Sequence, residues 1–301
     1  MLQSLPTQIK TNPSIKTAVI PAAGMGTRML PMTKAVPKEL LPVYDRPIIQ
    51  HVVEEALEAG IEKIIIVDGP NKEGIRAHFE AQASLQAALE KSGKVAQLKS
   101  LEHTADLASR ISYVRQDQPL GLGHAILQAE PLIGADEEAF AVILPDDLMI
   151  GGSNALADMK KTWGSFGGGH ILGLQEVPAD QTGKYGIVEP EMQLGDDFVL
   201  ASVVEKPSPA VAPSNLAVIG RYILDRCIFD DLSAGQVGHG GEIQLTDSIE
   251  RTAHAVGLSG RRLNTQRFDC GSPQGWLSAQ NAMAKHVSQK LYKTAKISVA
   301  A

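Results

Sequence analysis

The sequence predicts an α/β protein built on a doubly wound sheet, and two observations carry this prediction. In the first half of the chain, short all-apolar runs alternate with longer segments of helical periodicity. All-apolar runs of this length are typical of parallel strands that are buried on both faces of a sheet. Such an alternation produces a sheet covered by helices on both sides, with ligands bound at the carboxyl ends of its strands.

The elements of this first half follow one another in the expected order. Pro47 opens a helix whose apolar positions, from Ile48 to Leu57, fall on one face, and Gly60 ends it. Further helices are predicted over residues 71–109, with a break near Ser92-Gly93, and over 123–129. Strands are predicted at Thr17–Pro21, Ile64–Val67, Ile111–Arg115 and Ala139–Leu144.

The second half changes character after the glycine-rich stretch 164–169. Its strands are predicted to pair in an antiparallel or mixed manner, so that they extend the sheet or cap a pocket. A turn is expected at Gly195-Asp196-Asp197, and residues 285–301 are predicted to form a helical tail. Strands are predicted near Ile171–Glu176, Gly186–Glu189, Ala201–Glu205 and Leu216–Tyr222, and helices at Ile243–Val256 and Pro273–Val287.

Composition limits the function classes. With 301 residues, 44% of them hydrophobic, the chain can bury a large core without disulfides. Its net charge of −6, with no basic block, argues against nucleic-acid binding. Two cysteines form no framework and indicate a reducing cytoplasm, and no stretch is long enough for a membrane span. Residues 1–15 are polar and are predicted to be a flexible arm.

A loop of small residues follows the first predicted strand. Ala22-Ala23-Gly24-Met25-Gly26-Thr27 leads directly into Arg28, and Lys34 and Lys38 come soon after. Small residues allow backbone N–H groups to approach an anion closely, and the cations can neutralise it. The dinucleotide motif would need a third glycine at Met29, and the Walker A motif would need Gly-Lys. The loop therefore indicates a polyphosphate site of another kind, with a tight strand-to-helix turn as the alternative.

Three aspartates follow predicted strands. Asp146 and Asp147 come after the run 142–144, and Asp269 precedes a helix that Pro273 opens. Carboxylates at strand ends are suited to a Mg²⁺ ion that also binds phosphate. Asp is equally common as a turn or helix-cap residue, so both interpretations stay open at this point.

Other polar residues follow predicted strands, at positions where they could contact a ligand. Pro207 stops a strand directly after Glu205 and Lys206 and could aim both into a cleft, although exposed charged strand ends are common. Gln116 follows another strand and offers a donor and an acceptor, which suits the edge of a pyrimidine. Gly121 lies close by in the sequence; His124 is more typical of a structural residue at a helix start.

Taken together, several motifs in this order resemble the sugar-nucleotide pyrophosphorylases, and within them the bacterial UTP–glucose-1-phosphate uridylyltransferases. The resemblance covers residues 16 to 285 and implies a Rossmann-like, nucleotide-diphospho-sugar transferase fold. It implies one domain with a nucleotide-binding half over about 16–150 and a sugar-binding half over about 151–285, followed by a tail over 286–301. The motifs begin at Pro21, Pro37, Gly121, Ile143, Val204, Pro213, Gly241 and Asp269.

The resemblance also implies a role for each matched residue. Uracil would be read by Ala23, Gly24, Gln116 and Gly121, with Glu39 near the ribose or uracil. The UTP phosphates would be held by Arg28 and Lys38, with Gly26 and Thr27 beside them. Mg²⁺ would be bound by Asp146 and Asp269, glucose by Gly186 and Glu205, and the sugar phosphate by Lys206. The position of Asp147 varies in the family, and the stretch Glu242–Asp247 has no assignable chemistry.

The activity that the resemblance implies is Mg²⁺-dependent transfer of UMP from UTP to glucose 1-phosphate, which gives UDP-glucose and pyrophosphate. An already ionised phosphate attacks the α-phosphorus in line, so no general base is needed, which agrees with the absence of any legible Ser-His-Asp or Cys-His arrangement in the sequence. Two alternatives remain at this stage: the same chemistry with another nucleotide such as dTTP or another hexose, and a non-catalytic sensor of sugar nucleotides. The family also implies a homo-oligomer, such as a tetramer.

Overall fold

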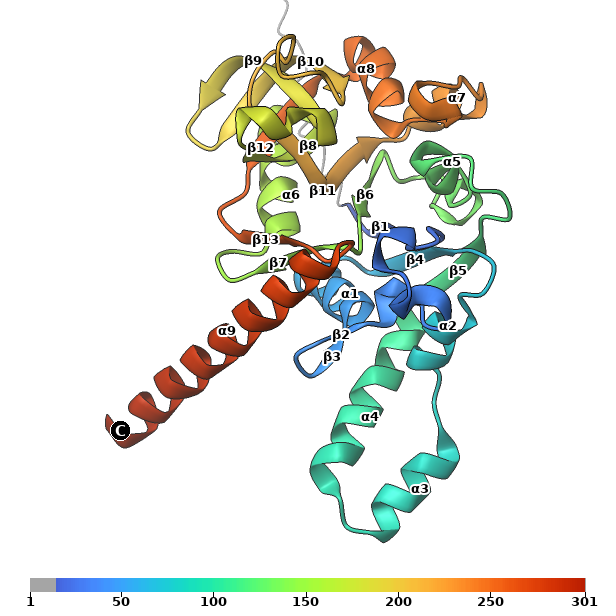
Figure 1. The fold of residues 1–301 in the computed structure, drawn as a ribbon, viewed down its shortest axis with the longest axis vertical. Helices are drawn as coiled ribbons and strands as arrows, with labels where there is room; N and C mark the ends of the chain where they lie inside the picture. Colours follow the sequence, from blue (N-terminus) through green and yellow to red (C-terminus); the bar gives the residue numbers. More distant parts are fainter. Residues whose placement is uncertain (1–14, 301) are drawn as a thin grey trace, which may run out of the picture.

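The computed structural model describes residues 15–300, of which His239 and residues 293–300 are described by their backbone only. Its centre is a nine-stranded mixed sheet that runs through both halves of the chain (Figure 1). The α/β class predicted from the sequence is confirmed. The strand order across the sheet is β5 (Ile111–Arg115), β4 (Lys63–Asp68), β1 (Thr17–Pro21), β6 (Ala139–Ile143), β11 (Leu216–Asp225), β8 (His170–Glu176), β12 (Leu258–Arg262), β10 (Asp197–Glu205) and β9 (Gly186–Leu194).

The direction of the strands changes in the middle of this sheet. Strands β5, β4, β1 and β6 are mutually parallel, which brings their carboxyl ends to one edge. Strand β11 is antiparallel to β6 and to β8, and β9 and β10 form an antiparallel hairpin. Strand β12 is parallel to β8 and antiparallel to β10. The mixed pairing predicted for the second half is therefore confirmed.

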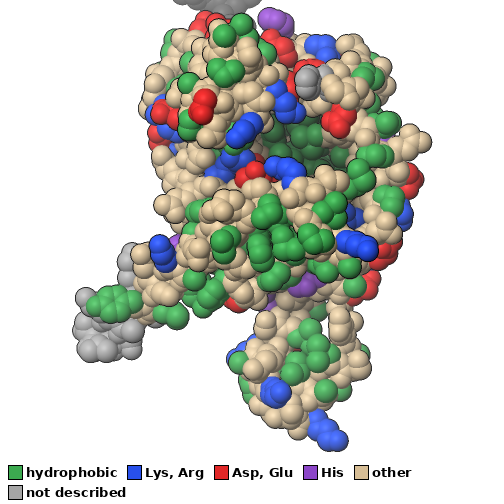
Figure 2. Space-filling view, in the orientation of Figure 1, with side chains coloured by type: hydrophobic (Ala, Val, Ile, Leu, Met, Phe, Trp, Pro, Cys, Tyr) green, Lys and Arg blue, Asp and Glu red, His purple; other side chains and the backbone are tan. Residues whose placement is uncertain are grey.

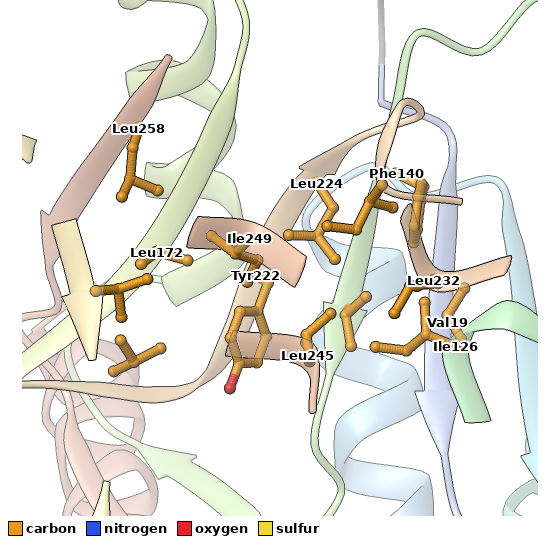
Figure 3. Close-up of a cluster of buried hydrophobic side chains, with 14 of the residues drawn as sticks. Val19, Ile126, Phe140, Leu172, Tyr222, Leu224, Leu232, Leu245, Ile249 and Leu258 are labelled. Carbon is orange, nitrogen blue, oxygen red and sulfur yellow. The ribbon is translucent and has the colours of Figure 1, made fainter. Parts of the chain in front are cut away.

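Helices cover both faces of the sheet. On β1, Val19 belongs to a core cluster with helices α5 (Leu122–Leu127), α7 (Ile228–Ser233) and α8 (Leu245–Val256), part of which Figure 3 shows. The neighbouring residues Ala18 and Ile20 belong to a second cluster with α1 (Ile48–Glu58), α2 (Glu73–Phe79) and α6 (Ala155–Phe166). Successive side chains of a strand point to opposite faces, so an all-apolar strand is what a sheet buried on both sides requires.

Two helical segments project from the body of the molecule (Figure 1). Helices α3 (Ala83–Lys91) and α4 (Val95–Leu107) form an arm, and the break between them lies at residues 92–94, where the sequence predicts it. Helix α9 (Pro273–Ala300) leaves the body as one long helix and includes the predicted tail, except for residue 301. Within residues 15–300, no helix combines the length and apolar character needed to cross a membrane.

Several elements differ from the sequence-based prediction. Helix α6 was not predicted, although the Asn154 side chain caps it by accepting from Ala157 N, and Gly167 ends it at φ +78°. Helix α7 and the strands β7 (Asp147–Ile150) and β12 were also not predicted. Two-residue strands β2 (Pro42–Val43) and β3 (Arg46–Pro47) precede α1, and β13 (Gln266–Asp269) pairs with β7.

The ends of the chain bear on the predicted domain limits. Residues 1–14 of the predicted arm lie outside the described residues. Ile15, its last residue, has 2% of its surface exposed and packs into the core beside β1. The core therefore includes Ile15, which lies two residues before the strand that carries the glycine loop.

Candidate active site

The loops that follow the parallel strands border a cavity of about 280 Å³ at their carboxyl ends. Ala23 and Met25 come from the loop after β1, Pro70 from the loop after β4, and Gln116 from the end of β5. The topology explains this gathering, because parallel neighbours end at the same edge of a sheet. The remaining lining residues include Thr33, Lys34, Pro37, Asn71 and Lys72.

The glycine loop presents open backbone to this edge. Ala22 N donates to Val67 O at 2.8 Å, which extends the ladder of β1 and β4 by one residue. Gly26 adopts φ +66°, a left-handed conformation that favours glycine, and its carbonyl accepts from Thr33 Oγ1 at 2.8 Å. No atom lies within 4 Å of a side chain built at Gly24. This part of the loop can therefore meet a ligand at close range.

A second cavity has a volume of about 400 Å³. Side chains of both charges gather around the hollow in the middle of the face in Figure 2. The cavity is lined from both halves of the sheet, because β6 and β11 are adjacent strands there. The predicted site residues that line it are Arg28, Asp146, Gly186, Glu205, Lys206 and Asp269.

Four of the predicted residues form one ion cluster. Lys38 Nζ donates to Asp146 Oδ2 at 2.7 Å, and Arg28 Nη2 lies 3.7 Å from the same oxygen. Arg28 Nη1 also donates to Asp269 Oδ2 at 3.3 Å. Two cations therefore face two carboxylates from segments more than 100 residues apart.

The cluster controls the charge of its own members. Burial by itself would lower the pKa of Lys38, but the carboxylates of Asp146 and Glu39 outweigh this and raise that pKa above its ordinary value. Burial likewise disfavours the charged form of Asp146, yet Lys38 and Arg28 hold its pKa below the ordinary value. Lys38 and Asp146 are therefore both ionised at neutral pH.

The two carboxylates converge on one point. A Cβ atom added to Gly271 would lie 2.8 Å from Asp146 Oδ2, 3.0 Å from Asp269 Oδ1 and 2.5 Å from Nη2 of the exposed Arg28 side chain. Glycine at this position leaves that point open. Two convergent carboxylates, with room for water and phosphate oxygens, match the donor set that Mg²⁺ prefers. The residues present therefore fit a magnesium ion.

Asp147 has a different environment from Asp146. Its Oδ1 accepts from Arg267 Nε at 2.8 Å, and its Oδ2 accepts from Gly220 N at 3.0 Å. These bonds join β7, β11 and β13, so the Asp147 carboxylate is used inside the protein. Of the two consecutive aspartates, the geometry leaves only Asp146 for a ligand.

Glu39 does not line either cavity. It is almost fully buried, and its Oε2 accepts from Lys72 Nζ at 2.7 Å while its Oε1 has no partner. Burial raises the pKa of Glu39 although Lys72 and Lys38 oppose the shift. Lys72 lines the first cavity, so the contact of Glu39 with that cavity runs through this lysine.

Gln116 is anchored by its neighbours. Its Nε2 donates to Gly121 O at 3.1 Å and lies 2.9 Å from His124 Nδ1. Gly121 has φ +110°, and a Cβ there would lie 2.8 Å from Ile243 O, so glycine is required on both grounds. The structure thus joins Gln116 and Gly121 in one unit and gives His124 a contact within it.

The sugar-side residues predicted from the sequence also meet. Glu205 Oε1 pairs with Lys206 Nζ at 2.9 Å, and a Cβ at Gly186 would lie 3.5 Å from Glu205 Oε2. Thr246 also lines this cavity; it lies in the stretch Glu242–Asp247, which the sequence matched without assigning it a role. Tyr185, Tyr222 and Arg267 line the same cavity and were not singled out in the sequence. Arg267 Nη1 donates to Tyr185 Oη at 3.3 Å. No local pattern marks these residues, because their contacts join distant segments.

The mixed sheet, with cations and carboxylates gathered where its parallel strands end, defines the class of this protein as an α/β enzyme for nucleotide chemistry. Comparison with known proteins narrows this class. The model of the family described as nucleotidyl transferase matches residues 17–286. A UTP–glucose-1-phosphate uridylyltransferase of Bacillus subtilis is 45% identical over 265 residues, which are 88% of each chain. One of Pseudomonas aeruginosa is 44% identical over 284 residues, which are 94% of this chain and 99% of the relative.

Solved structures agree with these relatives. A UDP-glucose pyrophosphorylase complexed with UDP-glucose has a TM-score of 0.79 at 40% identity, over 90% of this chain and 99% of the other. A UTP-bound UGPase from Acinetobacter baumannii has a TM-score of 0.80 at 40% identity, over 89% of this chain and 92% of the other. The chain belongs to the nucleotidyl transferase family, in its UTP–glucose-1-phosphate uridylyltransferase branch. The resemblance found in the sequence is confirmed.

Proposed function

We propose that this chain transfers UMP from UTP to glucose 1-phosphate and so forms UDP-glucose and pyrophosphate. The observation that carries the proposal is the ion cluster of Arg28, Lys38, Asp146 and Asp269. Three of its members line the larger cavity, and Pro37, next to Lys38, lines the smaller one. The names of the relatives support the choice of UTP and glucose 1-phosphate.

The smaller cavity is assigned to the nucleoside. Ala23 and Gln116 line it, with Gly24 exposed in the same loop and Gly121 bonded to Gln116. An amide side chain suits uracil, which offers one N–H donor between two carbonyl acceptors. Glu39 acts here through Lys72, which it holds at the cavity.

The triphosphate is assigned to the open glycine loop and its cations. Gly26 and Thr27 lead the chain to Arg28, whose side chain is 62% exposed and therefore free to follow a ligand. Lys38, which bonds Asp146 at 2.7 Å, supplies a second cation. These positive charges offset the repulsion between the two anionic substrates and stabilise charge in the transition state.

The larger cavity is assigned to the sugar phosphate. Gly186 leaves space beside the Glu205 carboxylate, which can accept from sugar hydroxyl groups. Lys206 is 39% exposed and is placed to hold the phosphate that attacks. That phosphate is already ionised at neutral pH, so the protein has to orient it in line with the α-phosphorus and needs no base.

Asp146 and Asp269 are the residues that would hold Mg²⁺. The bound ion would supply positive charge to the phosphate oxygens and to the leaving pyrophosphate. Among the described residues no group of three or more His, Cys, Asp or Glu side chains could hold a metal, so a two-carboxylate site completed by phosphate is the arrangement the chain offers.

Three broader assignments belong to this proposal. The strand order β5-β4-β1-β6 supports a Rossmann-like nucleotide-binding half over about 16–150 and a sugar-binding half over about 151–285. The two cysteines are free thiols, which supports a reducing cytoplasm. The projecting helix α9 supports a homo-oligomer, which light scattering would test.

The test is pyrophosphate release by the purified protein with UTP, glucose 1-phosphate and Mg²⁺. We expect turnover that a chelator abolishes, and about a 10²-fold or greater loss in Lys206→Ala, since such charge-stabilising groups are worth several kcal/mol. Lys161→Ala, which removes a lysine with 77% of its side chain exposed on α6, is the matched control. Absence of turnover with every sugar phosphate would refute the proposal and favour a non-catalytic sensor.

The same assay distinguishes the reaction of UTP with glucose 1-phosphate from the same chemistry with another nucleotide or another hexose 1-phosphate. A pocket that merely tolerates a 5-methyl group discriminates weakly, so dTTP is the critical competing nucleotide. Ranking kcat/KM for UTP against dTTP, and for glucose 1-phosphate against other hexose 1-phosphates, decides between them. We expect UTP and glucose 1-phosphate to rank first.

A further inference from the structure

The segment Glu242–Thr246 borders the larger cavity and has no role in the function proposed above. Ile243 N donates to Leu120 O at 2.8 Å, and Gly123 N donates to Ile243 O at 2.9 Å. These bonds fix Ile243 beside the Gly121 turn. They also explain why helix α8 begins at Leu245 and not at Ile243, since the backbone of Ile243 is already bonded outside a helix.

The end of this segment at Leu245 and Thr246 lies at the start of helix α8, on the cavity assigned above to the sugar phosphate. Leu245 is 1% exposed and packs into the core, which fixes the first turn of α8. Thr246 follows it and lines the larger cavity, where its Oγ1 donates to Glu205 Oε2 at 2.7 Å. A hydrogen bond to a carboxylate at this distance is short and charge-assisted, which makes it stronger than a bond between neutral groups.

Each oxygen of Glu205 therefore has one partner. Oε2 accepts from Thr246, and Oε1 pairs with Lys206 Nζ at 2.9 Å. The two partners differ in mobility, because Lys206 is a flexible side chain with 39% of its surface exposed, whereas Thr246 is a short side chain on a packed helix.

On the proposed function, a bound sugar phosphate would act on these two partners unequally. A sugar phosphate in the cavity carries negative charge and attracts Lys206, which frees Glu205 Oε1 to accept from a sugar hydroxyl. Thr246 is uncharged, so the phosphate does not draw it away from Glu205 Oε2. It then remains the side chain that fixes the direction of the Glu205 carboxylate.

We propose that Thr246 is a positioning residue that orients Glu205 toward the hexose and thereby sets which hexose 1-phosphate the enzyme accepts. This inference rests on the proposed function and adds a specificity role to it. Discrimination between hydroxyl epimers depends on a polar group held in one place, since a carboxylate free to rotate can follow a hydroxyl to either position.

The test replaces Thr246 by Val, which keeps the shape and removes the hydroxyl, and by Ser, which restores the hydroxyl. KM for glucose 1-phosphate, KM for UTP and the ratio of kcat/KM for glucose 1-phosphate over galactose 1-phosphate are measured for each variant. For Thr246→Val we expect about a tenfold rise in the first KM, a UTP KM within about twofold of wild type, and about a tenfold fall in the ratio. Thr246→Ser should stay within about threefold of wild type on all three.

Thr252→Val is the matched control. Thr252 lies on the same helix, but its hydroxyl bonds Ser248 O at 2.7 Å and the buried His170, away from both cavities. Its loss reports structural damage to α8 alone, so we expect reduced stability and an unchanged glucose-to-galactose ratio. Thr246→Ala removes the hydroxyl a second way if the valine variant folds poorly.

The results separate the inference from the function on which it rests. A wild-type protein that turns over no sugar phosphate refutes the proposed function. An active wild type with an unchanged ratio in Thr246→Val and Thr246→Ala refutes the positioning role alone. Equal rises in both KM values, or a serine variant as impaired as the valine variant, would also overturn it.

Discussion

Replacing Arg221 by methionine removes the buried ion pair that Arg221 forms with Glu55 at the centre of the sheet. Arg221 is fully buried, and its Nε and Nη2 donate to the two oxygens of Glu55 at 2.9 and 2.7 Å. Its guanidinium also donates to the carbonyls of Leu144, Asp147 and Gly220 at 3.3, 2.8 and 2.9 Å. The side chain thus joins α1 to the ends of β6 and β7 and to the irregular middle of β11.

The cost of the substitution follows from what it leaves behind. Methionine fills much of the space of Arg221 but leaves the Glu55 carboxylate, whose side chain is 13% exposed, without its charged partner. Breaking a buried pair in this way costs about 3–5 kcal/mol. Because each kcal/mol moves the midpoint of a domain of this size by about 2–4 °C, Tm should fall by about 10 °C.

A second substitution isolates the charge from the packing. In the Glu55→Met/Arg221→Met double variant no charge is left unpaired, and apolar replacement of a whole buried pair is often close to neutral. Both variants leave the three carbonyls without this donor, at about 1 kcal/mol each, but only Arg221→Met also leaves the Glu55 carboxylate unpaired. The double variant should therefore be less stable than wild type but more stable than Arg221→Met. Urea unfolding at pH 7 measures the free energy of unfolding of wild type, Arg221→Met, Glu55→Met and the double variant. A single variant within about 1 kcal/mol of wild type, or a double variant that loses the sum of both singles, would refute the reasoning.

Three further predictions concern the site and the core. Gly271→Ala places a Cβ against Arg28 Nη2 and the oxygens of Asp146 and Asp269, so the arginine must move and the carboxylates must separate. We expect kcat to fall about 10²-fold with little change in urea midpoint, and a fully active variant would contradict the assignment of these residues to the site. Asp269→Asn removes one carboxylate, so the Mg²⁺ concentration for half-maximal pyrophosphate release should rise about tenfold or more, while an unchanged requirement would move the metal elsewhere. Burial lowers the pKa of His170 from 6.5 to about 4, with nearby Asp225 opposing, so its contribution to stability is complete above pH 6.5 and is lost as pH falls toward 4. Urea unfolding should show a loss of roughly 2 kcal/mol between pH 7 and 5 that His170→Gln lacks, and parallel pH profiles would rule out His170 as its source.

The parallel half of the sheet could be predicted from the sequence because burial on both faces leaves a local mark. The run Ile64–Val67 is apolar at every position, and each of its residues is fully buried. Strand β12 leaves no such mark, since Leu258–Arg262 contains two arginines and a glycine and becomes a strand by pairing with β8 and β10 on either side. Helix α6 did leave a local pattern, with Leu156, Met159 and Trp163 on one face and Asn154 as a cap, but the glycines at its end obscured it.

The site residues also fall into those with a local sequence pattern and those that depend on distant contacts. Residues at strand ends, such as Gln116 and Asp146, could be singled out because the topology of a parallel sheet brings strand ends together. Thr246 and Arg267 act through partners 41 and 120 residues away in the sequence, Glu205 and Asp147, and no spacing rule connects them. For Glu39, the sequence motif could be recognised, but its burial against Lys72 could not be predicted from it.

The two lysines of the proposed site share one arrangement, which suggests how a cavity this crowded with charge accepts anionic substrates. Lys38 bonds Asp146 at 2.7 Å on the nucleotide side, and Lys206 pairs with Glu205 at 2.9 Å on the sugar side. On the proposed function, each phosphate draws its lysine away from a carboxylate that then has a second partner, a metal for Asp146 and a sugar hydroxyl for Glu205. An unpaired charge in a partly buried site is costly, and this exchange avoids one both before and after binding. Substrate binding would then replace one set of ion pairs by another, and Asp146 and Glu205 would be free to hold a metal and a sugar hydroxyl only with the phosphates in place.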